Sequence, residues 1–271
     1  MNEQKIRNSI ESIIDTLTKY GVETKSGTWQ ANQLFEDQVM LVRRNVIFIL
    51  ELTEVDLDKI GADLPWAEDH FQERISGKPT NPGEAYKTWP YAKFKDGEDP
   101  YQDGKVFSHT YQERFWPKHA GPRPILKQVQ KDPTKFEGYS NHKGIRYEVG
   151  DLQDVINQLK ENPLTRQAYL PIFFPEDTGA VHKQRVPCTL GYYFWVKDGV
   201  LYMNYTIRSC DALRHFRNDI YLTCRLLQYV AGELNLMVGE VNFIIFNFHV
   251  FKNDLFALKK KELKIWKELV G

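Results

Sequence analysis

The stretch Arg208–Asp219, with the sequence Arg-Ser-Cys-Asp-Ala-Leu-Arg-His-Phe-Arg-Asn-Asp, decides the fold and the chemistry predicted for this chain. It begins with an arginine and a serine and contains carboxylates at Asp211 and Asp219. An arginine fork can hold phosphate oxygens through two hydrogen bonds, and an ionised carboxylate accepts hydrogen bonds from donors such as the amino group of a heterocycle. The stretch therefore predicts chemistry on a nucleotide.

Residues on either side of this stretch add a nucleophile and a further polar group. Cys188 follows a proline upstream, and His249 lies downstream within an apolar run. A single cysteine of this kind is most often a buried structural residue, because free cysteine packs as a small apolar side chain. The catalytic interpretation of Cys188 therefore depends on the combination of motifs and not on the cysteine alone.

The combination resembles the thymidylate synthase family over residues 150–254, and within it the deoxycytidylate hydroxymethylases of bacteriophages. The family's Pro-Cys, Arg-Ser-x-Asp and His-x-Tyr motifs match Pro187-Cys188, Arg208–Asp211 and His249–Phe251, the last with phenylalanine in place of tyrosine. Residues 162–167, Asn-Pro-Leu-Thr-Arg-Gln, resemble the family's Asp-Pro-x-Ser-Arg-Arg. The resemblance implies an α/β (α+β) thymidylate synthase fold, in which a mixed β-sheet is covered by helices, as a single domain over residues 1–271.

Local patterns predict the individual elements. Apolar residues three or four apart indicate an amphipathic helix over residues 2–20, and Asp151 is expected to cap a helix that ends before Pro163. The apolar run 46–52 fits either a buried strand or a helix. We expect strands at 168–174, 190–196, 200–207 and 241–251, a hairpin turn at Lys197–Gly199, a long buried helix at 220–236, and a loop-rich insertion at about 78–135.

Charge and cysteine content exclude several classes of protein. The 271 residues include 36 basic and 36 acidic side chains, so the formal net charge is zero and binding to duplex nucleic acid is not expected. There is no long apolar run and no signal-peptide pattern, so we expect no membrane association and a cytoplasmic location, in the host if the chain is viral. The three cysteines have neither zinc-site spacing nor the pattern of a disulfide framework, and no metal is expected.

The resemblance implies covalent catalysis by Cys188. In the family, the equivalent thiolate adds to carbon 6 of a pyrimidine and makes carbon 5 nucleophilic toward a one-carbon unit from 5,10-methylenetetrahydrofolate. Nearby arginines would lower the thiol pKa, as this reaction requires. Tyr111 matches a tyrosine near the catalytic cysteine. Glu68 best matches the general acid–base glutamate, which the family places on a helix one turn before an aromatic residue, and Glu73 is the alternative.

Phosphate binding is expected to involve Arg208, Ser209, Lys25 and Arg166. In the family, the arginine equivalent to Arg166 reaches into the site of the partner subunit, so the resemblance also implies a homodimer. Gln167 stands where a second arginine is common, which predicts a weaker or rearranged phosphate contact.

Four further residues have counterparts around the sugar and the folate. His249 resembles a histidine near the substrate sugar. Phe251 lacks the hydroxyl that bonds the 3′-hydroxyl in the family, which leaves the choice between deoxyribose and ribose open. Trp89 matches a tryptophan that lies against the folate, and Asp211 matches an aspartate that accepts hydrogen bonds from the pterin. Each could instead be an ordinary core aromatic or turn residue.

The residue at position 219 predicts which pyrimidine base the site binds. The resemblance places it where thymidylate synthases have an asparagine, and the string 216–219, Phe-Arg-Asn-Asp, is shared with the phage hydroxymethylases. An ionised carboxylate cannot donate to the carbonyl of uracil, but it can accept from the amino group of cytosine and share a proton with the adjacent ring nitrogen. In the alternative, Asn218 contacts the base and Asp219 only caps the helix that begins at Ile220.

These residues predict a deoxycytidylate 5-hydroxymethyltransferase that binds dCMP and folate and adds water to the exocyclic methylene. Thr189 after the cysteine, as in the phage enzymes, favours water addition. The alternatives are reductive methylation of dUMP or dCMP, hydroxymethylation of CMP, and a nucleotide-binding regulatory protein on the same fold.

Overall fold

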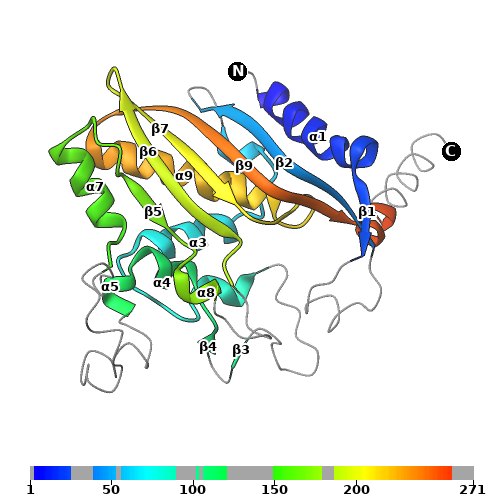
Figure 1. Cartoon of the computed structure of the whole chain (residues 1–271), viewed down its shortest axis with the longest axis horizontal. Helices are drawn as coiled ribbons and strands as arrows, with labels where there is room; N and C mark the ends of the chain where they lie inside the picture. The colour runs from blue at the N-terminus through cyan, green and yellow to red at the C-terminus, as the bar shows by residue number, and fades with distance from the viewer. Residues whose placement is uncertain are drawn as a thin grey trace.

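A mixed β-sheet with helices on one face forms the centre of the molecule (Figure 1). The computed structural model describes residues 3–25, 39–52, 56–89, 102–103, 106–120, 149–178 and 186–257. The strands are, in spatial order, β1 (Val22–Lys25), β2 (Val39–Glu51), β9 (Met237–Phe251), β7 (Val200–Ile207), β6 (Thr189–Lys197) and β5 (Tyr169–Pro171), and β8 (Cys210–Asp211) pairs with β9 off this path.

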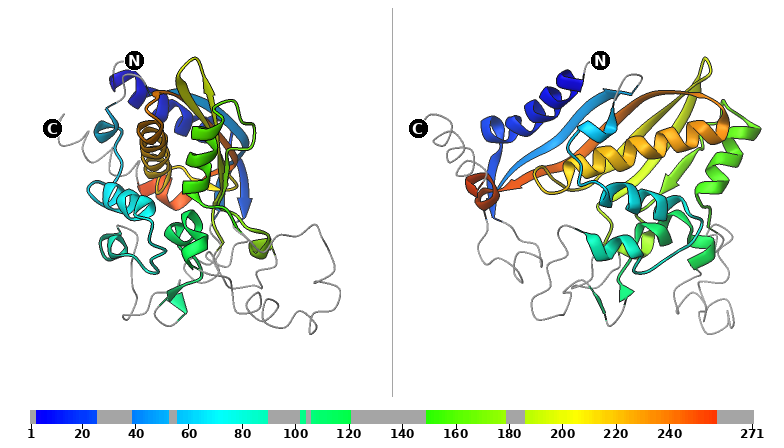
Figure 2. Two further views of the ribbon diagram at one scale, coloured as in Figure 1. Left: turned by 90° about the vertical axis from the view of Figure 1, so that its left-hand side faces the viewer. Right: turned by 180° about the vertical axis from the view of Figure 1, so that it is seen from behind.

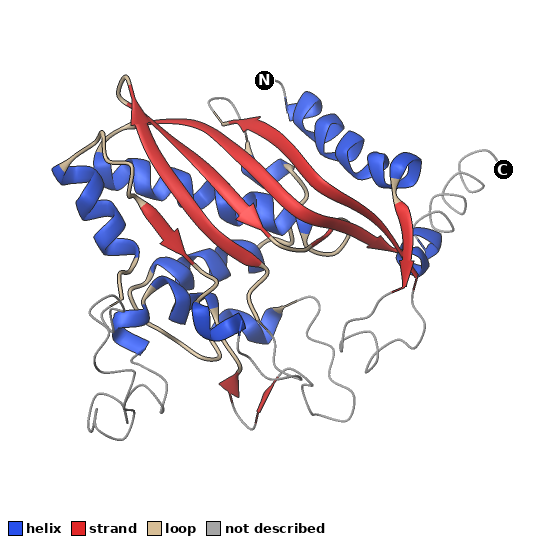
Figure 3. Ribbon diagram, viewed as in Figure 1, coloured by secondary structure: helices blue, strands red, loops and turns tan. Residues whose placement is uncertain are grey.

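The sheet combines both kinds of strand pairing. β7 and β8 run parallel to β9, whereas β1–β2, β2–β9, β5–β6 and β6–β7 are antiparallel (Figure 3). The parallel β7–β9 pair requires a crossover, and the long helix α9 (Phe216–Leu234) provides it. The predicted mixed sheet covered by helices is thus confirmed.

The longer described helices lie on one side of the sheet, as Figure 2 shows from two directions. α9 packs on β7 and β9, and α1 (Glu3–Tyr20) packs on β2. α7 (Leu152–Glu161) contacts α9 and β5, and α3 (Trp66–Ile75) contacts α9 and α4 (Tyr111–Phe115). Within the described ranges, no helix is both long and apolar enough to cross a membrane.

Two neighbouring rows of cross-strand partners show that one face of the sheet packs against the helices and the other does not. One row aligns Phe48, Phe243, Tyr205 and Tyr192, whose rings contact one another beneath the helices at centroid distances of 4.6, 5.6 and 5.2 Å. The next row aligns Ile49, Asn242, Asn204 and Tyr193 on the opposite face, because side chains alternate along each strand. No described element covers that second face.

Several local predictions are confirmed. Residues 3–20 are helical, and Asp151 caps α7 in a capping box with Asp154. The hairpin between β6 and β7 turns at Asp198 and Gly199, which both have positive φ (51° and 76°), the backbone of a two-residue hairpin turn. The ambiguous run 46–52 belongs to a strand, β2.

Other boundaries differ from the predictions. The strand expected at 168–174 is limited to β5, residues 169–171. The described parts of the predicted insertion contain short elements: η2 (Glu84–Thr88), β3 (Gln102–Asp103), β4 (Val106–Phe107), α4 and α5 (Pro117–Ala120). Helix α9 begins at Phe216, and its N-cap is His215, so Asp219 lies in the first turn and is not the cap.

Candidate active site

Cys188 lies immediately before β6, beside the guanidinium of Arg208. The two residues face each other where β6 and β7 pair, and Arg208 N donates to Cys188 O at 2.9 Å. The side chain of Arg208 donates from Nε to Pro187 O (2.8 Å) and from Nη2 to Val186 O (3.0 Å). Nη2 also lies 3.8 Å from the half-buried Cys188 Sγ. A fixed positive charge at this distance favours the thiolate, which is the nucleophilic form.

A chain of hydroxyl groups continues from the cysteine into the protein. Thr189 Oγ1 is buried and lies 3.2 Å from the hydroxyl of Tyr111 and 3.1 Å from that of Tyr205. Burial raises the pKa of the Tyr111 hydroxyl, and the charge of Cys188 acts in the same direction. Tyr111 therefore stays protonated and can act as a hydrogen-bond donor near the nucleophile.

Asp219 is a half-buried residue in the first turn of α9. Burial raises its pKa to about 6, although the hydrogen bond from Cys210 and the charge of Arg74 act against this shift. Cys210 Sγ lies 3.4 Å from Asp219 Oδ2. A carboxyl group with this pKa can hold or release a proton near neutral pH.

Asn218, the alternative base-reading residue, is engaged elsewhere. Its Nδ2 donates to Asp63 Oδ2 at 2.8 Å, and its Oδ1 accepts from Asp63 N at 2.8 Å. With only 3% of its surface exposed, Asn218 fastens the start of α9 to the segment before α3. Both ends of its amide are occupied, whereas the carboxyl of Asp219 interacts electrostatically with Tyr111 and Tyr205.

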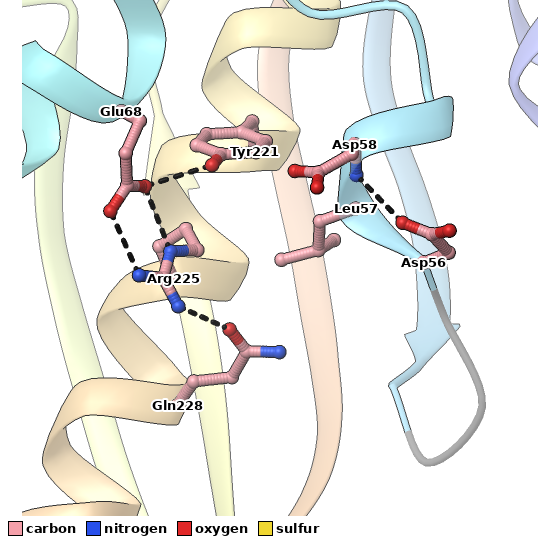
Figure 4. A pocket seen from close by; sticks show the side chains of 7 residues that line it. All are labelled: Asp56, Leu57, Asp58, Glu68, Tyr221, Arg225 and Gln228. Atoms are coloured by element: carbon pink, nitrogen blue, oxygen red, sulfur yellow. Dashed lines mark hydrogen bonds and ion pairs between the residues drawn. The ribbon is translucent and has the colours of Figure 1, made fainter. Parts of the chain in front are cut away.

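Glu68 forms an ion pair on the outer side of α9 (Figure 4). Arg225 donates to both carboxylate oxygens, from Nη2 to Oε1 at 2.9 Å and from Nε to Oε2 at 3.0 Å, and the Tyr221 hydroxyl donates to Oε2 at 2.8 Å. The pKa of Glu68 is lowered because these hydrogen bonds outweigh its desolvation. Together with Asp56, Leu57, Asp58 and Gln228, these three residues line a pocket of about 440 Å³.

Glu73, the second candidate for the acid–base role, joins η2 to α4. Its Oε1 accepts from Ala85 N at 2.9 Å, and its Oε2 accepts from Gln112 Nε2 at 2.8 Å. Among the described residues, neither Glu68 nor Glu73 forms a hydrogen bond or ion pair with the residues around Cys188. The structure therefore does not bring either glutamate together with Cys188.

Two residues of α3 that the sequence patterns missed do face this region. His70 and Arg74 are one turn apart, and Arg74 Nη2 lies 3.0 Å from His70 Nε2. The guanidinium of Arg74 stacks 4.0 Å from the centre of the Tyr111 ring, and the His70 ring meets Tyr111 edge-on at 6.5 Å. Their four-residue spacing is the one sequence signal that could have identified them.

The predicted phosphate ligands are spread across the sheet. Arg208 and Ser209 follow the central strand β7 and are half-buried. Lys25 is exposed at the end of β1, one edge strand, whereas Arg166 is exposed just before β5, the opposite edge strand. A single chain therefore does not bring Arg166 and Lys25 together.

Asp211 and Trp89, which are predicted to bind the folate, both lie near the start of α9, where each contacts His215. Asp211 is buried, and its Oδ1 accepts from the backbone N–H groups of Leu213 and Arg214 at 3.0 Å, so it also has the structural role of a turn residue. His215 N donates to Asp211 O, and the Trp89 ring stacks 6.5 Å from the His215 ring.

His249 lies on β9 opposite Asp211 of β8. Burial lowers its pKa, while the charge of Asp211 opposes the shift. Its Nδ1 is buried and has no hydrogen-bond partner among the described residues, which leaves a polar atom for a ligand to satisfy. The ring of Phe251 lies edge-on to His249 at 5.6 Å. No group of His, Cys, Asp and Glu suited to a metal ion occurs in the described ranges.

The chain is similar to known proteins in sequence and in fold. The family model for thymidylate synthase matches residues 84–268. A putative thymidylate synthase of Methanosarcina acetivorans is 29% identical over 157 residues, which is 58% of this chain and 70% of that protein. A thymidylate synthase of Buchnera aphidicola (Schizaphis graminum) is 28% identical over 45% of each chain.

A solved structure supports the fold independently of close sequence similarity. Thermostable thymidylate synthase A from Bacillus subtilis superposes with a TM-score of 0.65 at 16% identity, covering 94% of this chain and 82% of that one. The predicted thymidylate synthase fold is therefore confirmed. Since the family model spans more than half of the sequence, the chain belongs to the thymidylate synthase family, whose members are folate-dependent one-carbon transferases.

Proposed function

We propose that this protein is a deoxycytidylate 5-hydroxymethyltransferase that uses 5,10-methylenetetrahydrofolate as its one-carbon donor. The observation that carries the proposal is the arrangement at the start of α9. Asp219, with its pKa raised to about 6, contacts Cys210 and interacts electrostatically with Tyr111, whereas both ends of the Asn218 amide are held by Asp63.

The arrangement suits cytosine better than uracil. A carboxyl group that changes protonation near neutral pH can accept from the amino group of cytosine and share its proton with the adjacent ring nitrogen. When a thiolate adds to carbon 6, negative charge moves onto that nitrogen, and a shared proton there stabilises the transition state. Asp219 would thus both select the base and lower the barrier.

The other residues divide into nucleophile and binding groups. Cys188, with Arg208 beside it, is the nucleophile, and Tyr111 is a hydroxyl donor next to it. Arg208 and Ser209 bind the phosphate with Lys25, and His249 offers its unpaired Nδ1 toward the sugar. Glu68 stays the sequence-based prediction for the general base, although its contacts are with Tyr221 and Arg225.

The residues near the start of α9 suit a folate. Trp89 supplies an aromatic plane, and Asp211 supplies a carboxylate that can accept from the donor groups of a pterin. When bound, 5,10-methylenetetrahydrofolate supplies the one-carbon unit.

A homodimer is part of the proposal. The sheet face that no described element covers has exposed apolar side chains at Ile47 and Ile49 (66% and 60%) and a stacked ladder of Tyr193, Trp195 and Tyr202. Apolar patches of this kind commonly mark protein interfaces. Arg166 is exposed in its own subunit, as expected for a residue that completes the site of a partner.

The deciding experiment incubates the protein with 5,10-methylenetetrahydrofolate and dCMP, dUMP or CMP, followed by mass spectrometry of the nucleotides. We expect addition of a hydroxymethyl group to dCMP. The second candidate is reductive methylation, which is favoured by the relatives named thymidylate synthase. It would produce a methylated nucleotide together with dihydrofolate, whose near-ultraviolet absorbance rises in proportion to product.

A further inference from the structure

Apart from the exposed Asp69, the ionisable residues of α3 point in three different directions. Glu68 contacts α9, and Glu73 contacts η2 and α4. His70 and Arg74 share the remaining face, which is directed at Tyr111 and through it at Thr189 and Cys188. The residue of this helix best placed to take part in the reaction is therefore an imidazole and not a carboxylate.

The hydrogen bond between His70 and Arg74 determines the protonation state and tautomer of the imidazole. An arginine guanidinium has donors but no acceptor, so His70 Nε2 must be the acceptor in the 3.0 Å contact with Arg74. An imidazole that accepts at Nε2 is neutral and has its proton on Nδ1. Arg74 is only 6% exposed, and its Nε is buried without a hydrogen-bond partner in the part of the chain that the structure describes.

The surroundings reinforce this neutral state. Trp66 stacks on the His70 ring at 5.1 Å, and Tyr111 meets it edge-on from α4. Burial, followed by the charge of Arg74, holds the pKa of His70 well below its ordinary value. Two acidic groups interact electrostatically with this cluster: Asp219 of α9 with Arg74 and Tyr111, and the thiol of Cys188 with Tyr111.

We propose that His70 is a catalytic residue of this site, which donates a hydrogen bond from Nδ1 to the polar edge of the bound pyrimidine. The inference rests on the proposed function, because it assumes that Cys188 adds to a pyrimidine. Addition moves negative charge onto the polar atoms of the ring, and a preorganised neutral donor stabilises that charge. Arg74 is a positioning residue, because it acts by holding the imidazole in the donor form.

Substitutions of His70 test whether this side chain acts as a hydrogen-bond donor or as a general base. His70→Asn keeps an N–H group at the position of Nδ1, His70→Asp supplies a carboxylate, and His70→Leu supplies neither. Asp69→Asn, an exposed change on the same helix, is the matched control. We expect His70→Leu to lose on the order of a hundredfold in kcat, with dCMP affinity nearly unchanged, as for loss of a transition-state donor. We expect His70→Asn to retain at least ten times more activity than His70→Asp.

Nuclear magnetic resonance of the full chain with ¹⁵N-labelled histidine tests the proposal without turnover. We expect His70 to be neutral with its proton on Nδ1 from about pH 6 to 8, and this signal to shift when dCMP is added. Arg74→Met should broaden or change the tautomer signal. A proton on Nε2, a cationic ring, or His70→Asp activity equal to or above that of His70→Asn would overturn the assignment. If the unmodified protein neither binds nor converts any pyrimidine nucleotide, the proposed function itself fails, whatever the tautomer of His70.

Discussion

Replacing Asp219 with asparagine should increase stability and change base choice at the same time. The carboxyl pKa rises from 3.8 to about 6 in the folded protein, which corresponds to roughly 3 kcal/mol against the ionised form. Because the folded state holds this proton more tightly than the unfolded chain, the free energy of unfolding falls as the pH rises from about 4 to about 6. The full cost is present above pH 6.

Asp219→Asn removes this cost, since an amide does not ionise. We expect the variant to be more stable at pH 7 by up to about 3 kcal/mol, less whatever the contact with Cys210 contributes, and the gain to vanish near pH 4. Denaturant unfolding at pH 4, 5.5 and 7 measures this difference. A gain that is the same at all three pH values would refute the reasoning from burial.

The same substitution tests base selection. An amide can donate to the carbonyl of uracil, whereas the carboxylate opposes it with a second acceptor, a mismatch of about 1–3 kcal/mol. Competition between dCMP and dUMP should therefore shift toward dUMP by roughly tenfold to several hundredfold in Asp219→Asn. The control is Asn218→Asp, which breaks both bonds to Asp63 and should destabilise the protein without changing base choice. If only the Asn218 variant changes base choice, the assignment of Asp219 is wrong.

Three further predictions follow from the site. Cys188→Ser should lose the chemical step by several orders of magnitude while nucleotide binding persists, and near-normal turnover would exclude it as the nucleophile. Mixing inactive Cys188→Ser and Arg166→Ala subunits should restore some activity, because each heterodimer would have one intact site; no recovery after proven subunit exchange would contradict shared sites. Glu68→Gln should lower the free energy of unfolding by about 1–2 kcal/mol, since it weakens the paired contact with Arg225. A large loss of turnover without a change in stability would instead support the predicted general-base role of Glu68.

Local sequence patterns correctly predict the elements that are stabilised by residues adjacent in the sequence. The two-residue turn at Asp198 and Gly199 and the capping box of Asp151 are encoded by adjacent residues, and both agree with the structure. The predicted start of α9, at residue 220, lies later than the observed start at Phe216. The first turn is held by contacts of Arg217 with Ile60 O and of Asn218 with Asp63, about 155 positions earlier in the sequence. Contacts at that separation leave no pattern in a short window.

The same limit explains the residue missed on α3. This helix has polar side chains on several faces, so periodicity does not show which one is directed at the nucleophile. That choice is made by α9, which binds Glu68, and by α4, which binds Glu73 and stacks against Arg74. The resemblance predicts a glutamate as the acid–base residue, whereas packing directs Arg74 and His70 of this helix at Tyr111.

Arg208 is expected to hold the phosphate, and it also contacts the segment that carries Cys188. Its Nε and Nη2 are bound to the carbonyls of Pro187 and Val186, so the cysteine that follows is anchored by the same guanidinium. The edge formed by Nη1 is the part that these bonds leave to a ligand. A phosphate bound at this edge would therefore share one guanidinium with the segment that carries Cys188. We expect a nucleoside without its phosphate to react more slowly with the thiol than the nucleotide does, because it lacks this common anchor.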